Sequence, residues 1–135
     1  MKINWILLLF LLSSCIIDPS GDYRFKVINH TNHLITIEYN IDTIPEYPAI
    51  NDTWLYLQDS IKINDTLKVL EYSYKPWPYF FERSKNKKVN LFIYNLELLK
   101  KYNHIDTLIK RKLYKRLEYS EKELNELDWT VEVKN

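Results

Sequence analysis

The chain has 135 residues, of which 46% are hydrophobic and 15% are aromatic. Its 19 basic and 18 acidic residues nearly cancel, which excludes a general electrostatic attraction to nucleic acid. A single glycine, Gly21, excludes a glycine-rich phosphate-binding loop, so the tight turns must use Asn, Asp and Pro. The length suits one domain, and the aromatic content favours strands.

The first fifteen residues predict export and attachment to lipid. Lys2 precedes eight apolar residues, Trp5 to Leu12, against about 20 needed to span a bilayer, and such a run is typical of a secretory signal. The stretch Leu12-Ser13-Ser14-Cys15 resembles a bacterial lipobox, in which cleavage precedes the cysteine and its thiol is acylated. An ordinary signal peptide, or a buried strand with an incidental thiol, is the alternative.

The lipobox resemblance implies a division of the chain into three parts. Residues 1–14 would be the signal peptide, residues 15–21 a lipid-anchored tether, and residues 22–135 a single folded domain. Stable anchoring needs more than one acyl chain, and bacterial lipoproteins typically carry three. The expected location is the bacterial outer membrane, with the leaflet left open.

Two hairpins are predicted in the first half of the folded part. Alternating residues predict strands at 22–28 and 33–39 around a turn at 29–32, then a loop at 40–53 and a short strand at 54–57. A second hairpin is predicted from 61–63 and 67–74. The segment Lys75-Pro76-Trp77-Pro78 is expected to break the sheet, because proline cannot donate to a ladder.

The second half contains clearer signals. A strand is predicted at 89–94, a helix at 96–102 and a strand at 113–119. Ser120 and Glu123 have the spacing of a capping box, which predicts a short helix that buries Leu124 and Leu127. Trp129, Val131 and Val133 alternate as a last strand, with Trp129 buried. The whole pattern predicts a mainly β fold, an antiparallel, immunoglobulin-like β-sandwich with one or two short helices.

The C-terminal pattern also carries a resemblance. With the lipobox, the ending Leu113 to Val133 resembles that of small lipoproteins of the Bacteroidetes type, in which a capped helical turn lies between a strand and a Trp-led strand. Leu91 to Asn95 and Lys101-Tyr102 fit the same pattern, so the resemblance covers about the last 45 residues. It implies an envelope lipoprotein and transfers no functional residue.

An aromatic stretch at 72–81 is the first candidate for ligand binding. Two prolines are expected to hold Trp77, Tyr79 and Phe80 in a stiff extended segment, where aromatic rings could stack on sugars or dock a partner strand. The alternative is that these rings cap the sandwich and fill its core.

A basic run at 109–117 places five positive charges in nine residues. It could contact lipid phosphates or the lipopolysaccharide core near the anchor. The alternative is a solvated strand face whose charge is balanced by acids nearby, namely Glu118, Glu121, Glu123 and Glu126.

Four Asp-Ser/Thr-aliphatic triplets resemble the acceptor sequence for O-glycosylation in bacteria of the Bacteroidetes type. Their hydroxyl residues lie at predicted loops or strand starts: Thr43, Ser60, Thr66 and Thr107. Ordinary turn chemistry is the alternative, because Asp and Thr favour turns.

Reactive constellations are scarce in this sequence. Cys15 is assigned to lipid, and the three histidines form no motif with a serine and an acid. His30 and His33 could bind metal with Asp22 or Glu38, but their predicted turn favours solvent-facing side chains, so neither a metal nor a cofactor is predicted.

The sequence therefore favours a non-enzymatic binding or scaffolding module that contacts the membrane through its lipid and binds an envelope protein or glycan. One alternative is an envelope glycan hydrolase with paired carboxylates such as Glu38 and Glu71, which a retaining enzyme needs about 5–5.5 Å apart. An immunity or inhibitor lipoprotein is the third interpretation.

Overall fold

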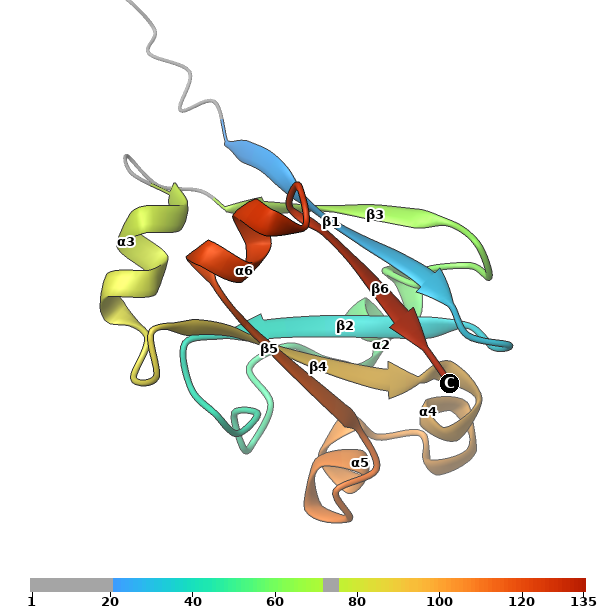
Figure 1. Ribbon diagram of the computed structural model, residues 1–135. Helices are drawn as coiled ribbons and strands as arrows, with labels where there is room; N and C mark the ends of the chain where they lie inside the picture. Colours follow the sequence, from blue (N-terminus) through green and yellow to red (C-terminus); the bar gives the residue numbers. More distant parts are fainter. Residues whose placement is uncertain (1–20, 72–75) are drawn as a thin grey trace, which may run out of the picture.

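The computed structural model describes residues 21–71 and 76–135, which form six strands and five helices (Figure 1). One sheet has the strand order β3-β1-β6, and its strands are β1 (Asp22–His30), β3 (Thr66–Glu71) and β6 (Thr130–Lys134). The other has the order β2-β4-β5, and its strands are β2 (Ile35–Asn40), β4 (Lys88–Asn95) and β5 (Lys115–Ser120). The helices are α2 (Thr53–Gln58), α3 (Pro76–Arg83), α4 (Leu96–Tyr102), α5 (Ile105–Lys110) and α6 (Glu121–Glu126).

The two predicted hairpins are wrong. In the first, successive strands enter different sheets, because β1 pairs with β3 and β6, whereas β2 pairs with β4. In the second, residues 61–63 form no strand, and Ile61 makes an isolated bridge to Ile35 instead of pairing with β3. The buried side chain of Asn29 explains the first departure. Its amide nitrogen donates to the carbonyl oxygens of His33 and Ile61, both at 2.9 Å, and its oxygen accepts from the backbone N–H of Thr31 at 2.9 Å. These bonds hold residues 29–33 as a corner that leads the chain from one sheet to the other.

The main hydrophobic core lies between the two sheets. Phe25 and Val27 of β1 and Val131 of β6 belong to the same apolar cluster as Leu91 and Ile93 of β4. All five side chains are 5% exposed or less, so this layer excludes water. The prediction of a mainly β, antiparallel sandwich is met only in part: the six strands form two small sheets accompanied by five helices, and β1 and β6 run parallel.

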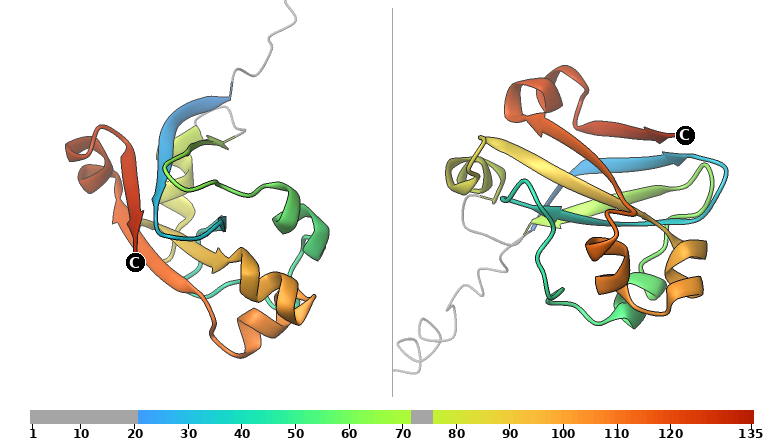
Figure 2. Two further views of the ribbon diagram at one scale, coloured as in Figure 1. Left: turned by 90° about the vertical axis from the view of Figure 1, so that its right-hand side faces the viewer. Right: turned by 90° about the horizontal axis from the view of Figure 1, so that it is seen from below.

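A second apolar cluster covers the other face of the β2-β4-β5 sheet. Phe92 and Tyr94 of β4 pack there with Leu99 of α4 and Leu108 of α5. Alternate residues of a strand point to opposite faces, so β4 buries both of its faces, and its sequence is apolar from Val89 to Tyr94 except at Asn90. Figure 2 shows α2, α4 and α5 gathered on this side of the molecule.

Helices are more numerous than the one or two expected. The predicted strand at 54–57 is the helix α2, and the predicted break at 75–78 leads into the helix α3. Proline is tolerated in the first turn of a helix, where its missing N–H is not needed, so Pro76 and Pro78 begin α3 and do not prevent it. The helix α5 was not predicted at all, and residues 72–75 of the aromatic stretch lie outside the described residues.

Other predictions are confirmed. The strand at 89–94, the helix at 96–102 and the last strand all form, and Trp129 is only 6% exposed just before β6. Both bonds of the capping box at Ser120 and Glu123 are present, and α6 buries Leu124. Leu127 is 45% exposed, so its predicted burial is wrong. The helix ends at Glu126, and Leu127 is its C-cap residue.

Candidate functional site

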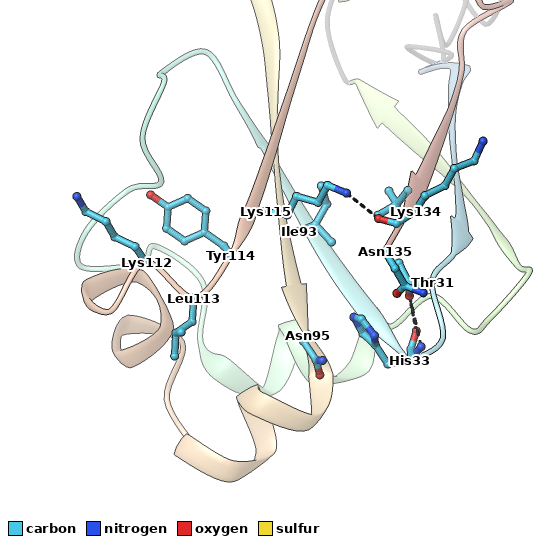
Figure 3. A pocket seen from close by; sticks show the side chains of 11 residues that line it. Thr31, His33, Ile93, Asn95, Lys112, Leu113, Tyr114, Lys115, Lys134 and Asn135 are labelled. Atoms are coloured by element: carbon cyan, nitrogen blue, oxygen red, sulfur yellow. Dashed lines mark hydrogen bonds between the residues drawn. The ribbon is translucent and has the colours of Figure 1, made fainter.

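A cleft of about 390 Å³ opens where the end of β6 lies near the start of β5 (Figure 3). Ligand sites typically occupy about 300–1,000 Å³. We call it the β5–β6 cleft, and it is lined by Thr31, His33, Ile93, Asn95, Lys112, Leu113, Tyr114, Lys115, Val133, Lys134 and Asn135. These residues come from the corner after β1, from β4, from the segment that enters β5, and from the last residues of the chain.

The lining combines an apolar surface with polar groups at the rim. Ile93 and Val133 are buried and belong to the core between the sheets, so the cleft is a gap at the end of that core. Leu113 is half-buried and packs against the cluster beneath the second sheet. No Asp or Glu lines the cleft in the part of the chain that the structure describes, whereas three lysines do.

The three lysines have different roles. The ammonium nitrogen of Lys115 donates across the cleft to the backbone carbonyl oxygen of Lys134 at 2.6 Å (Figure 3). The ammonium nitrogen of Lys134 instead pairs with the carboxylate of Glu132 at 2.7 Å. In Figure 3 the side chain of Lys112 points away from the cleft. Lys115 therefore provides the positive charge that lies within the cleft itself.

Both strands beside the cleft are edge strands among the described residues. β6 pairs in parallel with β1, and the N–H of Lys26 donates to the carbonyl oxygen of Trp129 at 2.8 Å. Backbone groups of a strand point alternately to its two sides, so those of Val131 and Val133 face β1. The backbone groups of Glu132 and Lys134 face the opposite way, toward β5, as the bond from Lys115 also indicates.

The structure separates the three aromatic residues that were candidates for ligand binding. Trp77 is fully buried and Phe80 is 8% exposed, and their rings lie 5.6 Å apart in the core between the sheets. Only Tyr79 is open to solvent, with 46% exposure and the guanidinium of Arg83 over its ring. The alternative, that these rings fill the core, therefore describes Trp77 and Phe80, which cannot stack on a surface ligand.

The basic run is divided among three segments and does not form one face. Lys110 at the end of α5 lies 5.1 Å from the ring centre of Tyr47, and Arg116 in β5 pairs with Glu118. The other acids proposed to balance the run have different contacts. Glu123 accepts from Ser120 in the capping box, and Glu126 pairs with Lys122 at 3.9 Å.

The candidate glycosylation residues lie in varied surroundings. Thr66 is exposed at the start of β3, and Thr43 lies half-buried in the bend that follows β2, both as expected. Ser60 is half-buried just before Ile61. Thr107 departs from the prediction, because it lies inside α5 and not in a loop.

The carboxylates of the hydrolase alternative are not brought together. The Glu38 carboxylate accepts hydrogen bonds from the hydroxyls of Tyr56 at 3.0 Å and Tyr94 at 3.3 Å, on the helix-covered face of its sheet. The Glu71 carboxylate accepts from the hydroxyl of Tyr39 at 2.9 Å. Glu38 and Tyr39 are neighbours in β2 and point to opposite faces, so the two carboxylates lie on opposite sides of the sheet.

Burial alters the titration of the group around Glu38. It raises the pKa of the Glu38 carboxyl, although the two tyrosine hydroxyls that donate to it act in the opposite direction. It also raises the pKa of both hydroxyls, and the nearby carboxylate adds to that effect. Because both tyrosines keep their protons, their hydroxyls act as donors to Glu38. The three side chains therefore form a hydrogen-bonded cluster that packs against one face of β2.

The candidate metal ligands also lie apart. His30 faces Glu132 across the β1–β6 pair, with 3.6 Å between the ring nitrogen and the carboxylate, whereas His33 lines the β5–β6 cleft. Residues 21–71 and 76–135 contain no group of three or more His, Cys, Asp or Glu side chains that could hold a metal ion.

Within the same two described ranges, no helix is both long and apolar enough to cross a membrane. Cys15 and the predicted signal peptide lie outside the described residues.

No family model matches this chain, and no curated protein or solved structure matches it at a significant level. The cleft was not predicted from the sequence, because its lining comes from segments far apart in the chain. The only local feature of the sequence that could have pointed to the cleft is Lys115, a charged residue that follows Leu113 and Tyr114 near the start of a predicted strand.

Proposed function

We propose that this chain is a non-enzymatic binding module of the bacterial envelope, anchored to the outer membrane by lipid on Cys15. The observation that carries the binding role is the β5–β6 cleft, which joins an apolar floor to a rim of lysines and backbone groups. A few polar groups around an apolar hollow are typical of a ligand site. The lipobox Leu12-Ser13-Ser14-Cys15 supports the anchor.

The proposal treats the two sheets as the layers of an open β-sandwich. Support comes from the apolar cluster to which both sheets contribute. The immunoglobulin-like form of that sandwich is not favoured, because β1 and β6 run parallel and three helices cover one sheet. The cleft would then be one open end of the sandwich, and the separation between β5 and β6 would determine the size of the ligand that it can hold.

Hydrolysis of a glycan is the less favoured function. A retaining glycosidase needs two carboxyls about 5–5.5 Å apart on one side of the substrate. Glu38 and Glu71 point to opposite faces of β2, and Glu38 is held by two tyrosines beneath the sheet. No observation specifically favours an immunity or inhibitor role. Such a protein also acts by binding a partner, so this role is compatible with the proposed binding module.

Photo-crosslinking in intact cells tests the binding role. A benzoylphenylalanine in place of Leu113 would face the cleft, whereas the same residue in place of Tyr79 would lie on the exposed side of α3. We expect a discrete crosslinked product from the first position and none from the second. A crosslinked product from position 79 alone would show that the binding surface is on α3 and not at the cleft. The absence of a product at both positions would contradict the proposed binding role.

A further inference from the structure

We propose that the β5–β6 cleft binds an extended acidic peptide segment of a partner protein, which adds as a strand to the free edge of β6. This inference rests on the proposed function and specifies the chemistry of the partner. It starts from the backbone of β6, because that strand uses only one of its two edges within the described residues.

The free edge has the groups that strand addition requires. The backbone N–H and C=O of Glu132, and the carbonyl of Lys134, face away from β1 toward the cleft. An unpaired strand edge is a template for another extended chain, and main-chain hydrogen bonds provide much of the affinity in such complexes. The five-residue length of β6 limits the added segment to a few residues.

The floor of the cleft would receive alternate side chains of the added strand. Side chains alternate between the two faces of a strand, so every second residue would turn inward, toward Ile93 and Lys115. Ile93 favours a small apolar residue at one inward position, and Lys115 favours an acidic residue at the next inward position. The intervening residues would lie on the outer face, beside Glu132 and Lys134, which pair with each other.

Lys115 gives the site its charge preference. Its ammonium nitrogen now donates to the carbonyl oxygen of Lys134, which an incoming peptide N–H would occupy. The displaced ammonium of Lys115, an exposed residue, would be left to solvent, because no acidic side chain among the described residues lines the cleft. A carboxylate on the peptide would replace that acceptor with a charge-assisted hydrogen bond, which is stronger than a neutral one. Lys115 would therefore favour acidic strands over neutral ones at this edge.

Three matched pentapeptides test the proposal on the full chain. The first is acetyl-Thr-Val-Thr-Glu-Thr-amide, in which Val and Glu share one face, the second has Gln in place of Glu, and the third keeps Glu but has N-methylated amides along one edge. Binding is measured from the NMR shifts of the amide signals of Glu132 and Lys134. We expect the acidic peptide to bind roughly ten-fold more tightly than the Gln peptide, which corresponds to about 1.4 kcal/mol. The N-methylated peptide should not bind, because it cannot pair with β6.

Two substitutions separate the roles of charge and backbone. Lys115→Met should abolish the preference for Glu over Gln, whereas Lys122→Met, a solvent-exposed lysine on α6, should retain it. Glu132→Pro removes an N–H that the ladder with β1 does not use, and edge strands accept proline. This variant should lose binding of the Glu and Gln peptides while its melting transition persists. If it fails to fold, the N-methylated peptide still decides the question.

Each contrary outcome has a definite meaning. Equal binding of the N-methylated and unmodified acidic peptides would show a site for anions and overturn strand addition. Equal binding of the Glu and Gln peptides would overturn the role of Lys115. Concentration-dependent dimerisation that excludes the peptides would assign the edge to a second copy of the chain. If Leu113 forms a crosslink in cells and no peptide binds, this inference fails while the proposed binding function stands.

Discussion

At the scale of single residues, Trp129 concentrates several interactions in one side chain. Its indole N–H donates to the side-chain oxygen of Asn125 at 2.8 Å, and its ring lies 5.6 Å from that of Trp77. The guanidinium of Arg24 lies 4.9 Å above the same ring. Its backbone has a positive φ of 55°, which is uncommon for a bulky residue and indicates that its surroundings hold it in place.

We expect Trp129→Ala to lower the free energy of unfolding by about 3–5 kcal/mol, as is typical for a buried Trp. That is a large share of the roughly 5–15 kcal/mol that stabilises a domain. Urea unfolding of the two proteins measures the difference. Leu127→Ala is the control, because Leu127 is 45% exposed and its loss should change little. Equal losses in the two variants would contradict the packing described here.

Glu38 predicts a dependence of stability on pH. Burial raises the pKa of its carboxyl above the unfolded value of about 4.3, so the folded chain binds this proton more tightly. The stabilisation from this group is present below the unfolded pKa and is lost as the pH rises through the folded pKa.

We expect the Glu38→Gln variant not to lose this stability as the pH rises, because Gln stays neutral and keeps one oxygen that accepts from the tyrosine hydroxyls. The melting temperature of the variant minus that of the parent should therefore increase from pH 4 to pH 7. Differential scanning calorimetry across this range measures it, and other titrating groups cancel where they do not contact Glu38. A difference that decreases with pH would show that the hydrogen bonds from Tyr56 and Tyr94 outweigh burial.

At the scale of elements, the capping box is a local feature with a local prediction. The hydroxyl of Ser120 accepts from the N–H of Glu123 at 3.3 Å, and the Glu123 carboxylate accepts from the N–H of Ser120 at 2.7 Å. Ser120→Ala removes the first bond, so chemical denaturation should show a loss of about 1 kcal/mol. Ser120→Asp should preserve most of the stability, since Asp is also a good N-cap residue. Equal losses from Ala and Asp would mean that the cap contributes little.

The elements also show why some structure was predictable and some was not. The capping box and the apolar run of β4 are encoded within a few neighbouring residues, so the sequence alone indicates them. The partners of β1 depend on the side chain of Asn29, which bonds to Ile61, 32 residues away. Turn-forming residues at 29–32 look the same whether the chain folds back as a hairpin or crosses to another sheet.

The candidate site was less predictable than the fold, for the same reason. The β5–β6 cleft exists because β5 and β6, in different sheets, leave a gap at one end of the shared core. Its bond between Lys115 and Lys134 joins residues 19 positions apart. By contrast, the aromatic stretch at 72–81 was conspicuous because Trp77 and Phe80 are core residues. A cluster of aromatic letters does not distinguish a core from a surface.

At the scale of the whole molecule, the apolar core and the proposed anchor come from different parts of the sequence. Among the described residues, both apolar clusters are built from residues between 25 and 133, whereas Cys15 lies outside the described residues. The tether would enter at Asp22, where β1 begins (Figure 1). Loss of the lipid should therefore change where the protein lies without changing how it folds.

The claim on which the proposed function depends is attachment through Cys15, and one substitution tests it most directly. Cys15→Ala removes the thiol that would be acylated and the cleavage signal with it. We expect the variant to lose fatty-acid labelling and partitioning into detergent in its native host, while the melting transition of the folded part persists. If the Cys15→Ala protein still takes up label and still partitions with membranes, the proposed anchor at Cys15 is contradicted.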